Sequence, residues 1–204
     1  MMHNSTNGSF RLYELKKTHY ICTVKSKSFS IVGIVLKRIS VGETDRIINI
    51  LTQEHGKITV VAKGVRKMKS SKRAYLEPGN IIKAFCVETK SLPLLTQATL
   101  IEDCSKMQQN LSAYRSLTQL LEIFEKLFVE MELETETFHY ALLLRKQVVA
   151  GKAPATFVRE ILGKIIVQLG FQHPDESKYN TISDYISALS DSKMKSFEYL
   201  HVKP

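Results

Sequence analysis

Short apolar runs separated by turn residues occupy the first half of the chain. Between residues 30 and 102 five runs rich in β-branched residues follow one another: SIVGIVLKRI, DRIINILT, KITVVAKGV, NIIKAFCVET and PLLTQATLIE. Runs of this length and composition, bounded by Gly, Pro and Asn, predict strands. Gly56 in the link QEHG predicts a tight hairpin, and Gly33 inside the first run predicts a bulge or a bend that lets the sheet close. The pattern therefore predicts a five-stranded barrel of the oligonucleotide-binding (OB) type, although other small barrels share that strand count.

After residue 103 the apolar spacing changes to that of helices. From Leu117 to Met131 leucine and phenylalanine recur at i, i+3, i+4 and i+7, which predicts a helix that begins near Ser105 and buries one face. Further helices are predicted near residues 135–151, over 154–170 and from 181 onward, where Thr and Asp have the spacing of a capping box. We therefore expect an α+β chain, with the barrel followed by a helical bundle.

The change in spacing places a boundary near residue 104. We expect an OB-fold nucleic-acid-binding domain over 29–103 and a helical domain over 104–204. Residues 1–28 carry no comparable apolar pattern and are predicted to be a disordered extension. That stretch also lacks the apolar core of a secretory signal, and no run approaches the length of a membrane helix, so a cytoplasmic protein is expected.

Charge divides the two halves sharply. Residues 1–103 contain 17 Lys and Arg against 8 Asp and Glu, whereas residues 104–204 contain 12 of each. Because the whole excess of positive charge lies with the predicted barrel, that half is expected to meet a polyanion, most commonly nucleic acid.

Basic side chains gather in the stretch VVAKGVRKMKSSKR and near the predicted strand ends. No acid intervenes between Glu54 and Glu77. A merely solvated loop is the alternative, but cations along a groove release counterions from phosphates and so bind DNA without reading its sequence. The candidate DNA-binding residues are Lys37, Arg38, Arg46, Lys57, Lys63, Arg66, Lys67, Lys69, Lys72 and Arg73.

Enzymatic patterns are weak. A phosphate-binding P-loop requires G-x-x-x-x-G-K-[ST], but Gly56 and Lys57 are followed by Ile58, and Leu51 lies where the first glycine is required. S-x-x-K matches in the segment 190–195 lack companion motifs and are attributed to chance. The glutamates between residues 122 and 136 are interpreted as a solvated helix face. We expect no catalytic residues and no enzyme activity.

Metal and stacking chemistry are also weakly supported. Cys22, Cys86 and Cys104 have no C-x-x-C spacing, and the six histidines form no ligand pattern, so neither a metal site nor a cofactor is expected. The barrel offers only three aromatic side chains, and Phe85 is expected in its core. Contacts to the nucleic-acid backbone should therefore dominate over base stacking.

Several segments resemble one family at matching spacing. The stretch GIVLKRISVGETDRIINILTQEHGKITVVAKGVRKMKS contains a G-E-x-D-R turn, a T-x-x-x-G-K hairpin and an A-K-G-x-R strand in succession. The similarity continues through LEPGNII, LPLLTQATLIED, AYRSLTQLLEIFEKL and EILGKIIVQLGF, and covers about residues 30–173. These motifs resemble the RecO family of bacterial recombination mediators.

That resemblance implies an OB domain and a helical domain without enzymatic turnover. It also implies binding of single- and double-stranded DNA, annealing of complementary strands and a nucleoid-associated place in the cytoplasm. With RecR, such proteins help load RecA onto DNA coated with single-strand-binding protein. Residue by residue, Lys63 and Arg66 fall in the A-K-G-x-R motif and Arg46 in the G-E-x-D-R motif, whose Gly42, Glu43 and Asp45 are expected to fix the barrel.

The sequence departs from the family pattern after the L-G-F helix end. Many members carry a four-cysteine zinc module there, whereas GFQHPDESKYNTISDY has no cysteine, so we expect a form without the module and without zinc. Two rival interpretations stay open. One is an RNA-binding or ribosome-associated OB-fold protein, and the other is an adaptor whose basic half docks an acidic protein tail.

Overall fold

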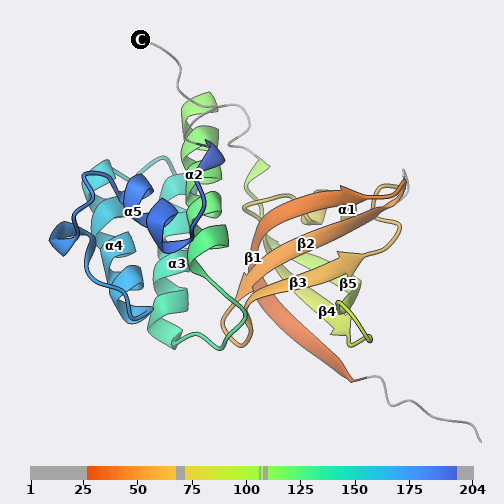
Figure 1. The fold of residues 1–204 in the computed structure, drawn as a ribbon. Helices are drawn as coiled ribbons and strands as arrows, with labels where there is room; N and C mark the ends of the chain where they lie inside the picture. The colour runs from red at the N-terminus through yellow and green to blue at the C-terminus, as the bar shows by residue number, and fades with distance from the viewer. Residues whose placement is uncertain (1–26, 68–71, 106, 108–109, 197–204) are drawn as a thin grey trace, which may run out of the picture.

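The computed structural model describes residues 27–67, 72–105, 107 and 110–196 (Figure 1). The five predicted strands are confirmed. They are β1 (Ser28–Val41), β2 (Asp45–Thr52), β3 (Gly56–Ala62), β4 (Ile81–Val87) and β5 (Leu94–Glu102). They close into a barrel in the order β1-β2-β3-β5-β4, with every pairing antiparallel except β3 with β5. This is the OB fold, with a short helix α1 (Lys72–Tyr75) between β3 and β4.

The helical half follows the predicted order. It contains α2 (Leu111–Leu127), α3 (Thr135–Val149), α4 (Ala155–Gln168), a 3-10 turn η2 (Pro174–Glu176) and α5 (Ile182–Leu189). Helix α2 begins later than Ser105, because the Asn110 side chain caps it by accepting a hydrogen bond from the Ala113 amide at 3.2 Å. Met131 lies beyond its end and is exposed, contrary to the predicted stripe.

The barrel core follows the alternation of its strands. Ile48 and Ile50 of β2 and Ile58 and Val60 of β3 point inward, while the residues between them along each strand lie nearer the surface. Of the bulge or bend predicted at Gly33, the bulge is wrong, because the register of β1 shifts further on, between residues 35 and 37. A Cβ at Gly33 would lie 2.3 Å from the Leu51 carbonyl oxygen, so this glycine permits close approach of two strands.

A second core joins the barrel to the helices. Ile34, Leu36 and Leu51 on the outside of the barrel belong to the same buried cluster as Leu117 and Phe124 of α2. Strand β1 therefore contributes Val35 to the barrel interior and its neighbours to the interface with α2. Figure 1 shows α2 standing beside the barrel, with α3, α4 and α5 to the left of it. This shared core fixes the barrel against α2.

Polar contacts hold the same junction. Arg145 of α3 is 2% exposed, donates from Nε to the Gly79 carbonyl at 2.8 Å and pairs with Glu102 at the end of β5. The segment after α2 hydrogen-bonds with the β2–β3 hairpin, since Lys57 N donates to Val129 O and Leu133 N to Gln53 O, each at 2.9 Å. Two separate sets of polar contacts, those of Arg145 and those of the hairpin, thus hold the barrel against the helices.

The strands end at Glu102 and the first long helix begins at Leu111. The division into domains over 29–103 and 104–204 stays a prediction, because the type of element changes there while one core crosses the limit. Of the predicted disordered extension 1–28, residues 1–26 lie outside the described residues.

Candidate nucleic-acid interface

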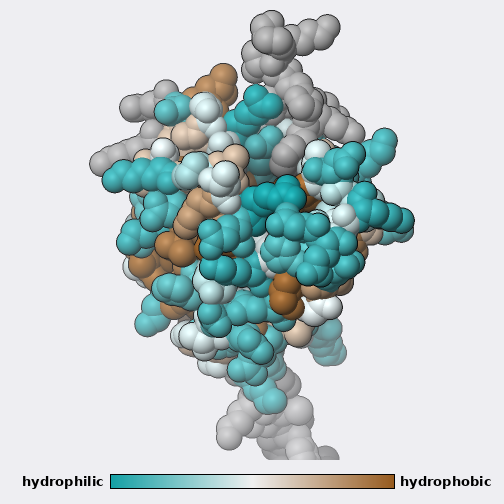
Figure 2. All heavy atoms as spheres, turned by 90° about the vertical axis from the view of Figure 1, so that its left-hand side faces the viewer, coloured by the Kyte–Doolittle hydropathy of each residue, from teal (hydrophilic) through white to brown (hydrophobic). Residues whose placement is uncertain are grey.

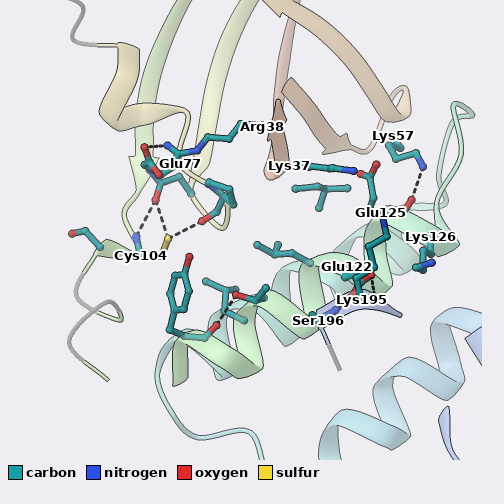
Figure 3. A pocket seen from close by; sticks show the side chains of 18 of the residues that line it. Lys37, Arg38, Lys57, Glu77, Cys104, Glu122, Glu125, Lys126, Lys195 and Ser196 are labelled. Carbon is teal, nitrogen blue, oxygen red and sulfur yellow. Dashed lines mark hydrogen bonds and ion pairs between the residues drawn. The ribbon is translucent and has the colours of Figure 1, made fainter. Parts of the chain in front are cut away.

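A cleft of about 1720 Å³ lies between the barrel and α2. Its barrel wall is formed by the middle of β1, the start of β3 and the segment from α1 to Asn80. Its opposite wall is formed by α2 and by residues 190–196 after α5. In Figure 3, Lys37 and Arg38 extend from the barrel above while Glu122 and Lys126 rise from α2 below. The cleft is wide enough to admit a ligand, and charged groups line both walls.

The barrel wall carries four of the predicted cations. Lys37 and Arg73 are exposed, and their side chains form no hydrogen bond or ion pair with the described residues. Arg38 is half-buried and pairs with Glu77. Lys57 donates from Nζ to the Glu125 main-chain oxygen, so it ties β3 to α2. Two cations of this wall are therefore available to a ligand, and two already hold partners.

The helical wall adds cations that the sequence did not predict. Lys126 donates from Nζ to the Ser192 and Lys193 carbonyls at 2.8 and 2.9 Å, which holds the segment after α5 against α2. In that segment Met194 is 3% exposed, so Lys193 and Lys195 on either side of it remain exposed and line the cleft. The K-M-K alternation was the only local signal, because this half of the chain has no net charge.

The main carboxylates of the cleft are already engaged. Burial opposes the ionisation of Glu122, but hydrogen bonds from the Ser196 hydroxyl and from the Ser196 and Lys195 amides outweigh it and lower its pKa. Glu125 accepts a hydrogen bond from Asn49 Nδ2 at 2.7 Å through Oε1, whereas its Oε2 is buried without a hydrogen-bond partner among the described residues. The prediction of a solvated glutamate face is therefore wrong for these two residues. Neither carboxylate forms an ion pair with the free cations of the cleft among the described residues, so those cations stay available to an outside anion.

A second cationic group, the turn cluster, consists of Lys63, Arg66 and Lys67 after β3. The loop is shaped by Asp45, whose Oδ1 accepts the Gly64 amide at 2.8 Å. Arg66 donates from Nη1 to the Gly42 carbonyl at 2.9 Å, while Lys63 and Lys67 are exposed. The G-E-x-D-R and A-K-G-x-R motifs thus meet in space, and Asp45 stabilises their junction.

Arg46 differs from the other candidates. It faces inward with Ile48 and Ile50 and is 7% exposed, so an approaching backbone does not meet it at the surface. Burial is the main cause that lowers its pKa, followed by the nearby charges of Arg38, Arg73 and Arg66. Its Nη1 lies 4.0 Å from Oε1 of Glu77, which lines the cleft. Lys69 and the side chain of Lys72 lie outside what the structure describes.

Aromatic side chains are placed differently from the expectation. Phe85 is 38% exposed and not in the core, because Ile82, Ala84 and Cys86 take the inward positions of β4. Tyr114 of α2 lines the cleft and is 48% exposed. A prediction limited to aromatic residues of the barrel left out this ring, which shares the cleft with the cations of the barrel wall.

Thiols and ligand sets give no support for metal chemistry. Within the described ranges, no group of three or more His, Cys, Asp and Glu side chains is placed to hold a metal ion. Burial raises the pKa of the Cys86 thiol to about 11 and also raises that of Cys104. Both cysteines are therefore weak candidates for a thiolate ligand or nucleophile. None of the described helices has the length and apolar character needed to cross a membrane.

The outer face of the helical half is shown in Figure 2. Hydrophobic residues are scattered there among a mostly hydrophilic surface. The cleft, by contrast, gathers charged groups from elements far apart in sequence. It is therefore the stronger candidate for a polyanion interface.

Comparison with known proteins points to one family. The family model described as "Recombination protein O N terminal" matches residues 27–103. A "DNA repair protein RecO" from Bifidobacterium longum subsp. infantis is 39% identical over 113 residues, covering 55% of this chain and 47% of its own length. Another from a Nocardioides species is 32% identical over 143 residues, covering 68% of this chain and 58% of its own length. The chain thus spans about half the length of the curated relatives it matches.

Among solved structures, a chain of the S. pombe Stn1–Ten1 complex is similar at 18% sequence identity. The alignment covers 47% of the present chain and 76% of the Stn1–Ten1 chain. Its TM-score of 0.31 is too low to support an inference. The strand order and the attached helices already define an OB-fold protein with a helical second half. Together with the family model and the relatives, they show that the chain belongs to the RecO family.

Proposed function

We propose that this chain is a DNA-binding mediator of recombinational DNA repair that acts by binding strands and not by chemical turnover. It binds single- and double-stranded DNA, anneals complementary strands and, with RecR, helps load RecA onto DNA coated with single-strand-binding protein in the cytoplasm, at the nucleoid. The observation that supports this most is the cleft, whose free cations lie on both walls and form no ion pair with its carboxylates among the described residues.

The physical basis is neutralisation of phosphates. Each phosphate that a Lys or Arg neutralises releases condensed counterions, which favours binding of any sequence and weakens steeply as salt rises. Lys37 and Arg73 on one wall face Lys193 and Lys195 on the other, so a strand in the cleft would be neutralised from two sides. The turn cluster offers a further surface, and two neutralised strands repel each other less. Annealing follows from that reduced repulsion.

The turn cluster supplies a first prediction. The turn-cluster variant replaces Lys63, Arg66 and Lys67 by alanine, together with Lys69, which follows them in the sequence. It should bind oligonucleotides of any sequence about tenfold more weakly, because fewer phosphates are neutralised. The slope of log K against log salt on single strands should also flatten by about 0.7 for each phosphate that is no longer neutralised. Fluorescence anisotropy over a range of salt concentrations measures both quantities. Unchanged affinity and slope would remove these residues from the interface.

Strand annealing tests the function as a whole. The full chain should accelerate pairing of complementary DNA strands, also when they are coated with single-strand-binding protein, and the turn-cluster variant should be slower. Preference for RNA oligonucleotides without annealing would instead favour the RNA-binding alternative. Binding to an acidic protein tail without DNA binding would favour the adaptor. Either result would contradict the proposal.

A further inference from the structure

Arg46 is a buried cation whose hydrogen-bonding groups are not satisfied. It is 7% exposed, and its Nε and Nη1 atoms have no hydrogen-bond partner among the described residues. The acid nearest to it, Glu77, places Oε1 at 4.0 Å from Nη1, beyond hydrogen-bond distance. A buried charged donor without a partner is costly, so natural proteins rarely keep one without a use. The Nε and Nη1 donors of Arg46 could therefore each bind a further acceptor.

Other arginines surround the same carboxylate. Arg38 of β1 pairs with the Glu77 oxygen that Arg46 approaches. Arg73 of α1 lines the same cleft as Arg38 and Glu77, and its charge adds to the larger effect of burial in lowering the pKa of Arg38 and of Arg46. One carboxylate with a half-buried side chain therefore lies against two arginines, with a third in the same cleft, and this excess of positive charge favours a further anion.

A phosphate group fits these donors better than Glu77 does. It presents several oxygens around one centre, and guanidinium groups bind such oxygens in pairs. Glu77 uses a single oxygen toward both Arg38 and Arg46 and leaves the Arg46 donors unpaired. Its side chain is 30% exposed, so it can turn toward solvent when a competing anion enters. Arg38, Arg73 and Glu77 all line the cleft, and Figure 3 shows Arg38 pointing toward Glu77 at one end of it.

We propose that Arg38, Arg46 and Arg73 form a phosphate seat at this end of the cleft, which Glu77 fills until a phosphate group displaces it. That the phosphate belongs to a DNA backbone rests on the function proposed above. The seat itself requires only the phosphate group. In this proposal Arg46 is the buried cation of the seat, and Glu77 competes with the phosphate group for the three arginines.

Removing the competing charge tests the seat on DNA. Glu77→Gln keeps the shape of the side chain, and it should tighten binding of a single-stranded oligonucleotide about fivefold. Glu54→Gln is the matched control, because it changes the net charge equally at an exposed turn outside the cleft. It should change affinity less than twofold. Equal effects of the two variants, or weaker binding by a Glu77→Gln protein with unchanged thermal unfolding, would overturn the seat in the DNA groove.

Inorganic phosphate tests the seat without DNA. The full chain should unfold at a higher temperature in phosphate than in chloride of equal ionic strength, and Glu77→Gln should enlarge this difference, because a ligand that binds only the folded state stabilises it. Arg73→Gln changes an exposed residue, so it should fold and lose the effect, whereas the exposed Lys152→Gln should keep it.

The two measurements separate failure of the seat from failure of the function. Stabilisation by phosphate that needs Arg73, in a chain that does not bind DNA, would support a seat for a free phosphate compound and contradict the proposed function. DNA binding with no specific phosphate effect, and with Glu77→Gln equal to Glu54→Gln, would overturn the seat and leave the proposed function standing.

Discussion

Replacement of Lys37, Arg73, Lys193 and Lys195 by alanine is expected to weaken single-stranded DNA binding about 100-fold at 0.1 M salt. The effect should exceed that of the turn cluster, because these side chains line both walls of the cleft and form no side-chain hydrogen bond or ion pair within the part of the chain that the structure describes. If each contacts one phosphate, the salt slope should also fall by about 3. Anisotropy titrations at several salt concentrations give both values.

The matched control removes four positive charges elsewhere. Lys90, Lys146, Lys152 and Lys178 are exposed and lie outside the cleft, so their replacement by alanine lowers the net charge equally. This control should lose less than about fivefold in affinity, since long-range attraction between exposed charges is screened at this salt concentration. If both variants lose the same affinity, the attraction is one of net charge and the cleft is not the binding surface.

The two walls of the cleft differ in how far sequence could predict them. Strand runs and their turn residues are local patterns, so the five strands, their order along the chain and the cations near their ends were visible. The cations of the helical wall were not visible, because the net charge of a sequence half does not show which charged residues share a surface in space. Lys193 and Lys195 belong to a half with no net charge, yet the packing of Met194 and the hydrogen bonds to Glu122 hold them against α2, where they line the cleft.

The predictions for Arg46 and Phe85 were wrong about which way a side chain points within its strand, and the sequence contains the information to correct them. Alternation along β2 places Arg46 on the same face as Ile48 and Ile50, and alternation along β4 places Phe85 opposite Ile82 and Ala84. Both follow from the two-residue period of a strand once its apolar face is known. Applied consistently, that period would have predicted a buried arginine and an exposed phenylalanine. What it could not predict is Glu77, which lies far along the chain from Arg46 and beside it in space.

Gly56→Ala is expected to have the largest effect on stability, lowering the free energy of unfolding by about 3–5 kcal/mol. A Cβ at this position would lie 2.3 Å from the Met131 carbonyl oxygen and 2.4 Å from that of Val129. The residue also has a φ of +56°, which costs an alanine about 1 kcal/mol. To relieve the clash, the segment after α2 must move away from the hairpin, which breaks the hydrogen bond from Lys57 N to Val129 O.

Gly42→Ala separates the two causes. Gly42 has almost the same φ, +55°, but nothing lies within 4 Å of the Cβ that alanine would add. It should therefore lose only about 1 kcal/mol, and urea unfolding of the two variants should differ by about 2–4 kcal/mol. Equal losses would mean that the segment after α2 gives way easily and does not hold the barrel against the helices. The expected difference instead makes this hairpin a fixed support of the cleft, because the contacts that Gly56 permits also position Lys57 and α2 on its two walls.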